Sequence, residues 1–299
     1  MKENKVYKIS KDQVIYAMSA EYAPVLSVDP KSQIEFETCD ALSGQITSET
    51  DQFAALDWNR INPATGPVYI NGAEPGDTLA VTIEQIKTAD VGVTITGPNM
   101  GVLGDVLKEN AIKVIPIEGE EAIFSESIRL PLNKMVGVIG TAPKEGAISC
   151  GVPDFHGGNM DCKEVREGAT VYLPVNVPGA LLALGDIHAV MADGEICVSG
   201  VEVSGSVRVR VNVIKGERYP LPMITTATHV MTLASHEDLD EAADMAVRNM
   251  VSYLCETVGF QADKAAMLLS LVGDVRICQI VDPKKTVRVE LEKKYMKTK

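Results

Sequence analysis

The stretch Ser206-Val-Arg-Val-Arg-Val-Asn-Val213 alternates polar and apolar residues over its whole length. Its four valines occupy every second position, so they point to one face of a strand while the polar residues point to the other. One buried face and one solvated face are typical of an antiparallel strand. The stretch therefore predicts a half-buried antiparallel β-strand at 206–213.

The same alternation recurs along the chain. Residues 78–84 alternate directly after Glu74-Pro-Gly-Asp77, which is a turn signal, and the apolar run at 180–184 fits a buried strand. Glycine and proline separate further short strand-like segments, which we expect at 34–38, 111–116, 169–175, 195–203, 275–281 and 286–291. This pattern predicts a mainly β fold of the sandwich or barrel kind.

Helical periodicity is confined to the last quarter of the chain. Ser235-His-Glu-Asp238 resembles a capping box, and apolar residues then recur near helical spacing as far as Gly259. Asp263 is suited to cap a second helix that ends at Gly273. We therefore expect a helical segment at about 236–272 and an α+β fold overall. Residues 1–299 are expected to form a single catalytic unit, in which about 96–125 form a small inserted unit.

Composition narrows the function classes. The chain has 299 residues, 45% of them hydrophobic, which is enough for a sizeable core. Its 41 acidic and 28 basic residues give a net charge of −13, which argues against nucleic-acid and anionic-membrane partners. A small neutral substrate is compatible with this charge.

The sequence also favours a cytoplasmic location. The first nineteen residues contain no apolar core of a signal peptide, and no run of eighteen apolar residues is present. The six cysteines are scattered without a C-x-x-C pair, so we expect reduced thiols.

Two segments rich in histidine, acid and glycine are the strongest candidates for chemistry. The first is Asp154-Phe-His-Gly-Gly-Asn-Met-Asp161, and the second runs from Gly185-Asp-Ile-His188 to Asp193-Gly-Glu195. In a strand, Asp186 and His188 face the same side, and carboxylate with imidazole suits zinc or another divalent metal. Ordinary turns at Gly157-Gly158 and Asp193-Gly194 are the alternative interpretation.

The N-terminal third adds further polar groups. Glu37-Thr-Cys-Asp40 ends a predicted strand, and residues 58–67 form an irregular stretch that carries the single tryptophan. Two interpretations of this stretch are open: a structural loop with Trp58 in the core, or a functional loop.

Several catalytic motifs are missing. The chain has no G-x-S-x-G elbow, no Walker A loop and no G-x-G-x-x-G that opens a helix. Cys150 lies six residues before His156 and is the remaining candidate for a nucleophile with a base.

Separated motifs along nearly the whole chain resemble those of the acetamidase/formamidase family. They are Phe36-Glu-Thr-Cys-Asp40, Asn62-Pro-Ala-Thr-Gly-Pro-Val-Tyr-Ile70, Gly72-Ala-Glu-Pro-Gly-Asp77, His156-Gly-Gly-Asn-Met-Asp161, Gly185-Asp-Ile-His188, Asp193-Gly-Glu195 and Gly273-Asp-Val-Arg-Ile-Cys-Gln279. The resemblance implies hydrolysis of small linear amides such as formamide and acetamide to ammonia and a short carboxylate. It also implies a β-sandwich or jelly-roll with an additional β module, a homo-oligomer, and an association with zinc.

On this basis we expect a divalent metal, Zn²⁺, that activates water. The expected ligands are His156, Asp161, His188 and Asp40. The expected catalytic residues are Glu195 as general base and acid, Asn159 facing the oxyanion, and Asp186 as a further ligand or a partner that orients an imidazole. The substrate is expected to contact Asn62, Thr65, Gly157 and Gly158.

Two alternatives are open at this point. One is a metal-stabilised β-sandwich that binds a small ligand or carbohydrate without turnover. The other is an amidase that depends on Cys150 and carries a purely structural metal.

Overall fold

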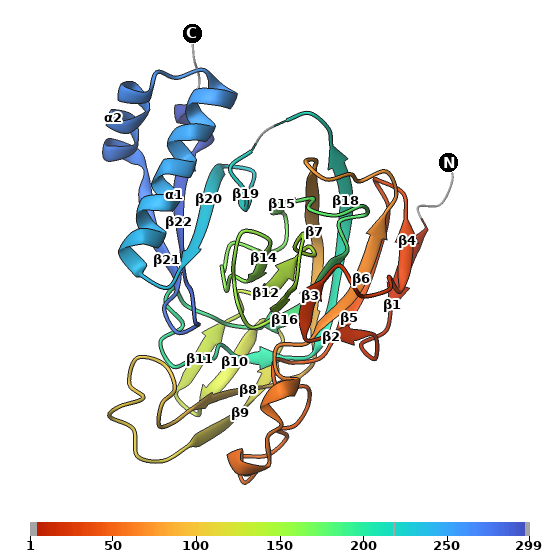
Figure 1. Ribbon diagram of the computed structural model, residues 1–299. Coiled ribbons are helices and arrows are strands. Elements are labelled where there is room, and N and C mark those ends of the chain that lie inside the picture. The colour runs from red at the N-terminus through yellow and green to blue at the C-terminus, as the bar shows by residue number, and fades with distance from the viewer. Residues whose placement is uncertain (1–4, 218, 297–299) are drawn as a thin grey trace.

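The computed structural model describes residues 5–217 and 219–296. Strands predominate, and they form two large sheets and one two-stranded sheet, while the two long helices lie together near the C-terminus (Figure 1). This confirms the predicted mainly β fold with two late helices.

The first sheet has nine strands, and the predicted strand at 206–213 lies within it as β18 (Gly205–Ile214). Val207, Val209 and Val211 are buried, whereas Arg208 on the other face pairs with Glu35. In spatial order the sheet contains β1 (Val6–Ile9), β5 (Gln33–Thr38), β18, β7 (Thr78–Thr88), β15 (Thr170–Pro174), β19 (Met223–Thr225), β20 (His229–His236), β22 (Lys285–Glu292) and β21 (Asp274–Gln279). All neighbouring pairs are antiparallel except β1 with β5.

The second sheet is built around β16 (Leu182–His188), every residue of which is buried. Burial on both faces explains why the sequence at 180–184 is continuously apolar rather than alternating. The path of this sheet is β11 (Ile128–Pro131), β10 (Glu121–Ser125), β9 (Ala111–Glu118), β8 (Val91–Thr96), β17 (Glu202–Val203), β16, β12 (Met135–Gly140) and β14 (Gly157–Asn159). Three further strands extend it beside β16, namely β6 (Ala64–Ile70), β2 (Val14–Ile15) and β4 (Leu26–Val28), and β3 (Ala17–Ser19) pairs separately with β13 (Ala147–Ser149).

The two large sheets share one hydrophobic core. Ile34, Val81 and Val209 of the first sheet belong to the same buried cluster as Leu184 and Ile187 of the second. This packing makes a sandwich, in which β16 is a fully buried strand of the second sheet.

The helices form a second, smaller core against β20 and β22. They are α1 (Leu239–Tyr253), a π-helical turn η3 (Leu254–Val258) and α2 (Ala262–Val272), and short 3₁₀ turns lie at η1 (Phe53–Ala55), η2 (Trp58–Arg60) and η4 (Lys293–Tyr295). Asp238, not Ser235, caps α1, because its carboxylate accepts the N–H groups of Asp240 and Glu241. Gln261 rather than Asp263 precedes α2.

Part of one strand prediction is wrong. Of the segment 195–203, only Glu202–Val203 pairs as a strand, and the residues before it form a loop in which Glu195 and Val198 have positive φ. Residues 111–125 supply β9 and β10 to the second sheet, whereas the single-unit organisation and the inserted unit at 96–125 stay predictions.

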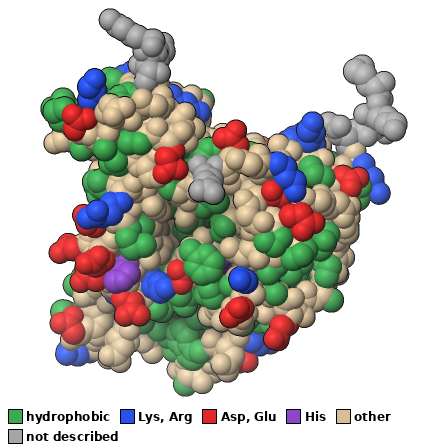
Figure 2. All heavy atoms as spheres, turned by 45° about the horizontal axis from the view of Figure 1, so that its top comes forward, with side chains coloured by type: hydrophobic (Ala, Val, Ile, Leu, Met, Phe, Trp, Pro, Cys, Tyr) green, Lys and Arg blue, Asp and Glu red, His purple; other side chains and the backbone are tan. Residues whose placement is uncertain are grey.

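No helix among the described residues is both long and apolar enough to cross a membrane. On the face seen in Figure 2, lysines and arginines are scattered among acidic side chains rather than gathered in one patch.

Candidate active site and metal centre

A cavity of about 740 Å³ opens beside the end of β16. Its lining residues come from six separate parts of the chain, namely Tyr16 and segments around 41–62, 95–101, 149–161, 186–202 and 281–283. Residues distant in sequence therefore converge on one space.

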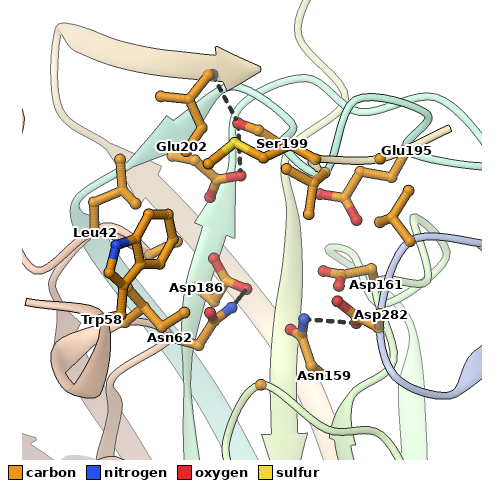
Figure 3. A pocket seen from close by; sticks show the side chains of 18 of the residues that line it. Leu42, Trp58, Asn62, Asn159, Asp161, Asp186, Glu195, Ser199, Glu202 and Asp282 are labelled. Atoms are coloured by element: carbon orange, nitrogen blue, oxygen red, sulfur yellow. Dashed lines mark hydrogen bonds between the residues drawn. The ribbon is translucent and has the colours of Figure 1, made fainter. Parts of the chain in front are cut away.

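His188, at the end of β16, is surrounded by carboxylates. Its Nε2 lies 3.3 Å from Asp186 Oδ1, 3.1 Å from Glu202 Oε2 and 3.8 Å from Asp161 Oδ1. Strand alternation puts Asp186 on the same side as His188, as predicted, and Glu202 is the register partner of His188 on β17. Figure 3 shows Asp161, Asp186, Glu195 and Glu202 together around the same space.

The three oxygens that converge on His188 make no well-aligned hydrogen bond, although His188 Nε2 lies 3.1–3.8 Å from them. Asp161 Oδ1, Asp186 Oδ1 and Glu202 Oε2 are all buried without one. One imidazole N–H can satisfy one acceptor, so it cannot compensate three inward-facing oxygens. A cation at this point would satisfy all three, since carboxylate oxygens and an imidazole nitrogen are ordinary ligands of a divalent metal.

Two overlapping groups can hold a metal ion. One is Asp161, Asp186 and His188, and the other is His188, Glu195 and Glu202; in each group the ligand atoms lie within 4.8 Å of one another. All five side chains are buried.

The backbone at this site is strained in a specific way. Asp161, Asp186 and Glu195 have φ values of 40°, 59° and 46°, in the left-handed region that non-glycine residues rarely occupy. Such conformations cluster at functional sites because the surrounding fold imposes them. Gly137 of β12 makes room for two of these acids, since a Cβ there would lie 2.4 Å from Asp161 Oδ1 and 2.7 Å from Asp186 Oδ2.

Burial and crowding of charge set the protonation of the site. Burial raises the pKa of Glu195 to about 8 and those of Glu202 and Asp282 to about 7, and it raises the pKa of Asp161 well above its usual range. Burial alone would lower the pKa of His188, yet the Glu202 and Asp186 carboxylates raise it well above its ordinary value.

The loop that carries Glu195 is fixed to the C-terminal strands. Arg288 of β22, whose side chain is 1% exposed, binds both carboxylate oxygens of Asp193 at 2.7 and 2.9 Å. The Gly194 N–H donates to the Cys278 carbonyl at 2.8 Å. Glu195 thereby lies 3.8 Å from His188 Nδ1.

The sequence analysis did not predict two acidic residues of this candidate site, Glu202 and Asp282. Glu202 lies on a strand so short that alternation could not assign its face. Asp282 comes directly after the predicted strand at 275–281 and precedes Pro283, which is typical of a turn. Its carboxylate accepts a hydrogen bond from the Asn159 side-chain N–H at 2.9 Å.

Some predicted residues line the cavity with these acids. Asn62 donates its side-chain N–H to Asp186 Oδ2 at 3.1 Å, and Asn159 presents a buried Oδ1 with no partner.

His156 does not join either group and does not line the cavity. Its ring is buried, neither nitrogen has a hydrogen-bond partner, and burial lowers its pKa to about 4. Gly157 and Gly158 belong to β14 and do not line the cavity, and the Gly157 N–H already donates to the Asp154 carbonyl. Their glycine character serves packing, because a Cβ on Gly157 would lie 2.3 Å from the Ile139 carbonyl oxygen.

Asp40 and Thr65 also lie outside the two groups. The Asp40 carboxylate accepts the N–H groups of Leu42 and Gly44, so it stabilises a turn. The Thr65 hydroxyl donates to the Glu37 carbonyl at 2.7 Å. Both side chains have partners within the protein.

Cys150 is not suited to be a nucleophile. It is fully buried, its thiol donates to the Ile15 carbonyl, and burial raises its pKa to about 12. The reactive thiolate is therefore scarce near neutral pH.

Comparisons with known proteins identify the family and the fold. A family model described as the Acetamidase/Formamidase family matches residues 11–150 and 144–292. An acetamidase from Bacillus halodurans has a solved structure with 46% identity and a TM-score of 0.95, covering 96% of this chain and 98% of that one. An acetamidase from Yersinia enterocolitica has 32% identity and a TM-score of 0.94, with 99% and 94% covered.

Curated relatives are more distant. A formamidase from Methylophilus methylotrophus is 24% identical over 253 residues, which is 64% of this chain and 61% of the relative. The chain spans about three fifths of the length of the curated relatives it matches. Because the family model covers nearly all of the sequence, the chain belongs to the Acetamidase/Formamidase family.

Proposed function

We propose that this protein hydrolyses the C–N bond of small linear amides, such as formamide and acetamide, and releases ammonia and a short carboxylate. The observation that carries the proposal is the group of unpartnered carboxylate oxygens around His188 at an open cavity. Family membership and the acetamidase relatives support it.

Asp161, Asp186, His188 and Glu202 are the residues that would hold a divalent metal. We propose Zn²⁺, because mixed carboxylate and imidazole ligation suits it. When bound, such an ion polarises the amide carbonyl and lowers the pKa of a water molecule to about 7. Asn62 orients Asp186 through the hydrogen bond to Oδ2 and leaves Oδ1 directed at His188.

Glu195 is the proposed proton carrier. Burial raises the pKa of the Glu195 carboxyl to about 8, and a divalent cation beside it would lower that pKa, so that the ionised form serves as the base near neutral pH. It takes a proton from the attacking water and delivers it to the leaving nitrogen. The Asn159 side-chain N–H already donates to Asp282, so instead of facing the oxyanion Asn159 presents its unpartnered Oδ1, which accepts a hydrogen bond from the amide NH₂ and orients the substrate.

Ammonia release from formamide, acetamide, propionamide and a lactam tests the proposal. We expect ammonia release from both formamide and acetamide, because these substrates differ by one methylene, which an enzyme discriminates by only about 1–3 kcal/mol. Saturable binding of acetamide in calorimetry without ammonia release would instead show a binding protein.

A homo-oligomer in the cytoplasm is also proposed. Met267 and Leu271 on α2 are 59% and 81% exposed, and contact with a second copy would bury them. Light scattering on the purified protein measures the assembly, and a monomeric mass would contradict it.

A further inference from the structure

The cavity is far larger than acetamide requires. Its volume of about 740 Å³ falls in the range of about 300–1,000 Å³ that is typical of pockets for drug-sized ligands. Acetamide has four heavy atoms, so it would leave most of this space to water.

Hydrophobic side chains form one side of the cavity, which we call the apolar wall. Leu42 and Ile95, together with the partly buried Ile61 and Met100, belong to a hydrophobic cluster separate from the main core, and all four line the cavity. The wall is thus supported from behind and presents hydrocarbon to the space in front of it.

Trp58 completes this wall at the cavity. The residue is 48% exposed, so the interpretation that Trp58 lies in the core is wrong, and its ring centroid lies 6.5 Å from that of Phe53. Figure 3 shows Leu42 and Trp58 on the opposite side of the space from Asp161 and Asp282. An indole held at a cavity wall gains favourable contact when a ligand removes it from water.

The charge of the cavity limits the ligand further. Its described lining contains several carboxylates but neither lysine nor arginine. A negative charge on the acyl group, away from the proposed metal, would be repelled by these carboxylates, whereas a neutral acyl group would not.

We propose that the preferred substrate is a neutral primary carboxamide with a bulky hydrocarbon acyl group of about six or more carbons, seated against Trp58 and Leu42. The inference rests on the proposed function and specifies its substrate. Water adds to the carbonyl carbon, the C–N bond breaks, and the nitrogen leaves as ammonia after it receives a proton. The acyl group remains against the apolar wall as part of the carboxylate product.

Steady-state hydrolysis of cyclohexanecarboxamide and acetamide tests this substrate class. We expect kcat/KM for cyclohexanecarboxamide to be at least about tenfold higher than that for acetamide, because each additional methylene buried against the wall strengthens binding of the transition state. Trp58→Ala should lower the cyclohexanecarboxamide value at least about tenfold, while Trp58→Phe retains most of the activity. Tyr22→Ala is the matched control, since Tyr22 is 42% exposed and lies outside the cavity lining.

Binding is measured independently of turnover through the single tryptophan. In Glu195→Gln, cyclohexanecarboxamide should change the Trp58 fluorescence saturably at a concentration at least about tenfold lower than acetamide does. Acetamide hydrolysis with no preference for the larger amide would overturn the inference and leave the proposed function intact. Saturable binding of the larger amide without hydrolysis of either would support the apolar subsite and overturn the proposed function, and neither binding nor hydrolysis would overturn both.

Discussion

At the scale of single residues, the site depends on acids that the fold forces together. Asp161, Asp186 and Glu195 each adopt a left-handed backbone conformation, and each lies near His188. A conformation that costs on the order of 1–3 kcal/mol persists only where surrounding contacts determine it. The fold around His188 therefore imposes the backbone conformation of these three acids.

Replacing Glu195 by glutamine should remove proton transfer. We expect kcat for acetamide to fall at least about a hundredfold, because the amide side chain cannot accept the proton of water. Elemental analysis of the same sample should find metal retained through Asp161, Asp186, His188 and Glu202. Turnover close to wild type would exclude Glu195 from proton transfer.

Replacing His188 by alanine should remove metal and activity together. This side chain is common to both groups that can hold an ion, so its loss leaves carboxylates alone. His229→Ala is the control, since His229 is a partly buried residue of β20 outside the cavity lining. Full metal content in the purified His188→Ala protein would contradict the ligand role.

At the scale of elements, β16 and the hairpin formed by β21 and β22 position several side chains of the proposed site. β16 contributes Asp186 and His188, while the C-terminal hairpin carries Asp282 and anchors the loop of Glu195 through Arg288. The sequence predicted that Asp186 and His188 lie on one face of a strand, because they are two residues apart. The sequence did not predict that the hairpin anchors the loop of Glu195, because Arg288 and Asp193 are 95 positions apart in the chain.

Arg288→Met should weaken both the fold and the position of Glu195. The buried guanidinium binds Asp193 and Glu290, so its removal leaves Asp193 with only the partly exposed Lys163 and Glu290 with only the half-exposed Arg276 as partners. We expect the free energy of unfolding to fall by about 3 kcal/mol and kcat for acetamide to fall with KM nearly unchanged. Urea unfolding and steady-state kinetics measure the two effects.

Arg276→Met provides the comparison for that variant, since Arg276 lies on the neighbouring strand and is 49% exposed. It should change stability by less than about 0.5 kcal/mol. Equal losses in the two variants would show that burial of Arg288 is not what matters.

At the scale of the whole molecule, the sequence predicted the class of fold well and the site less well. Alternation at 206–213 and the late helical periodicity gave strands and helices close to those observed, because period alone determines which face is buried. Site prediction favoured His156 for its polar, glycine-rich neighbourhood, yet those glycines serve close packing of β14 on β12. Glu202 and Asp282 reach the site only through tertiary packing, and no local pattern encodes that.

The same acid cluster should make stability depend on pH and on metal. Without metal, the folded protein binds more protons than the unfolded chain, because burial raises the pKa of Glu195 to about 8 and that of Glu202 to about 7. Stability of the chelated protein should therefore fall as pH rises from about 5 to 8. We expect its Tm to drop by at least about 5 °C relative to the metal-loaded protein over that window, measured by calorimetry. Parallel curves with and without metal would contradict a cation among these acids.

The most direct test of the account is ammonia release from acetamide by protein stripped with a chelator, dialysed, and then supplied with one equivalent of Zn²⁺, with metal content measured at each stage. The account predicts that activity and bound metal disappear together and return together, with the ion held by Asp161, Asp186, His188 and Glu202. Undiminished ammonia release from the metal-free protein would contradict it.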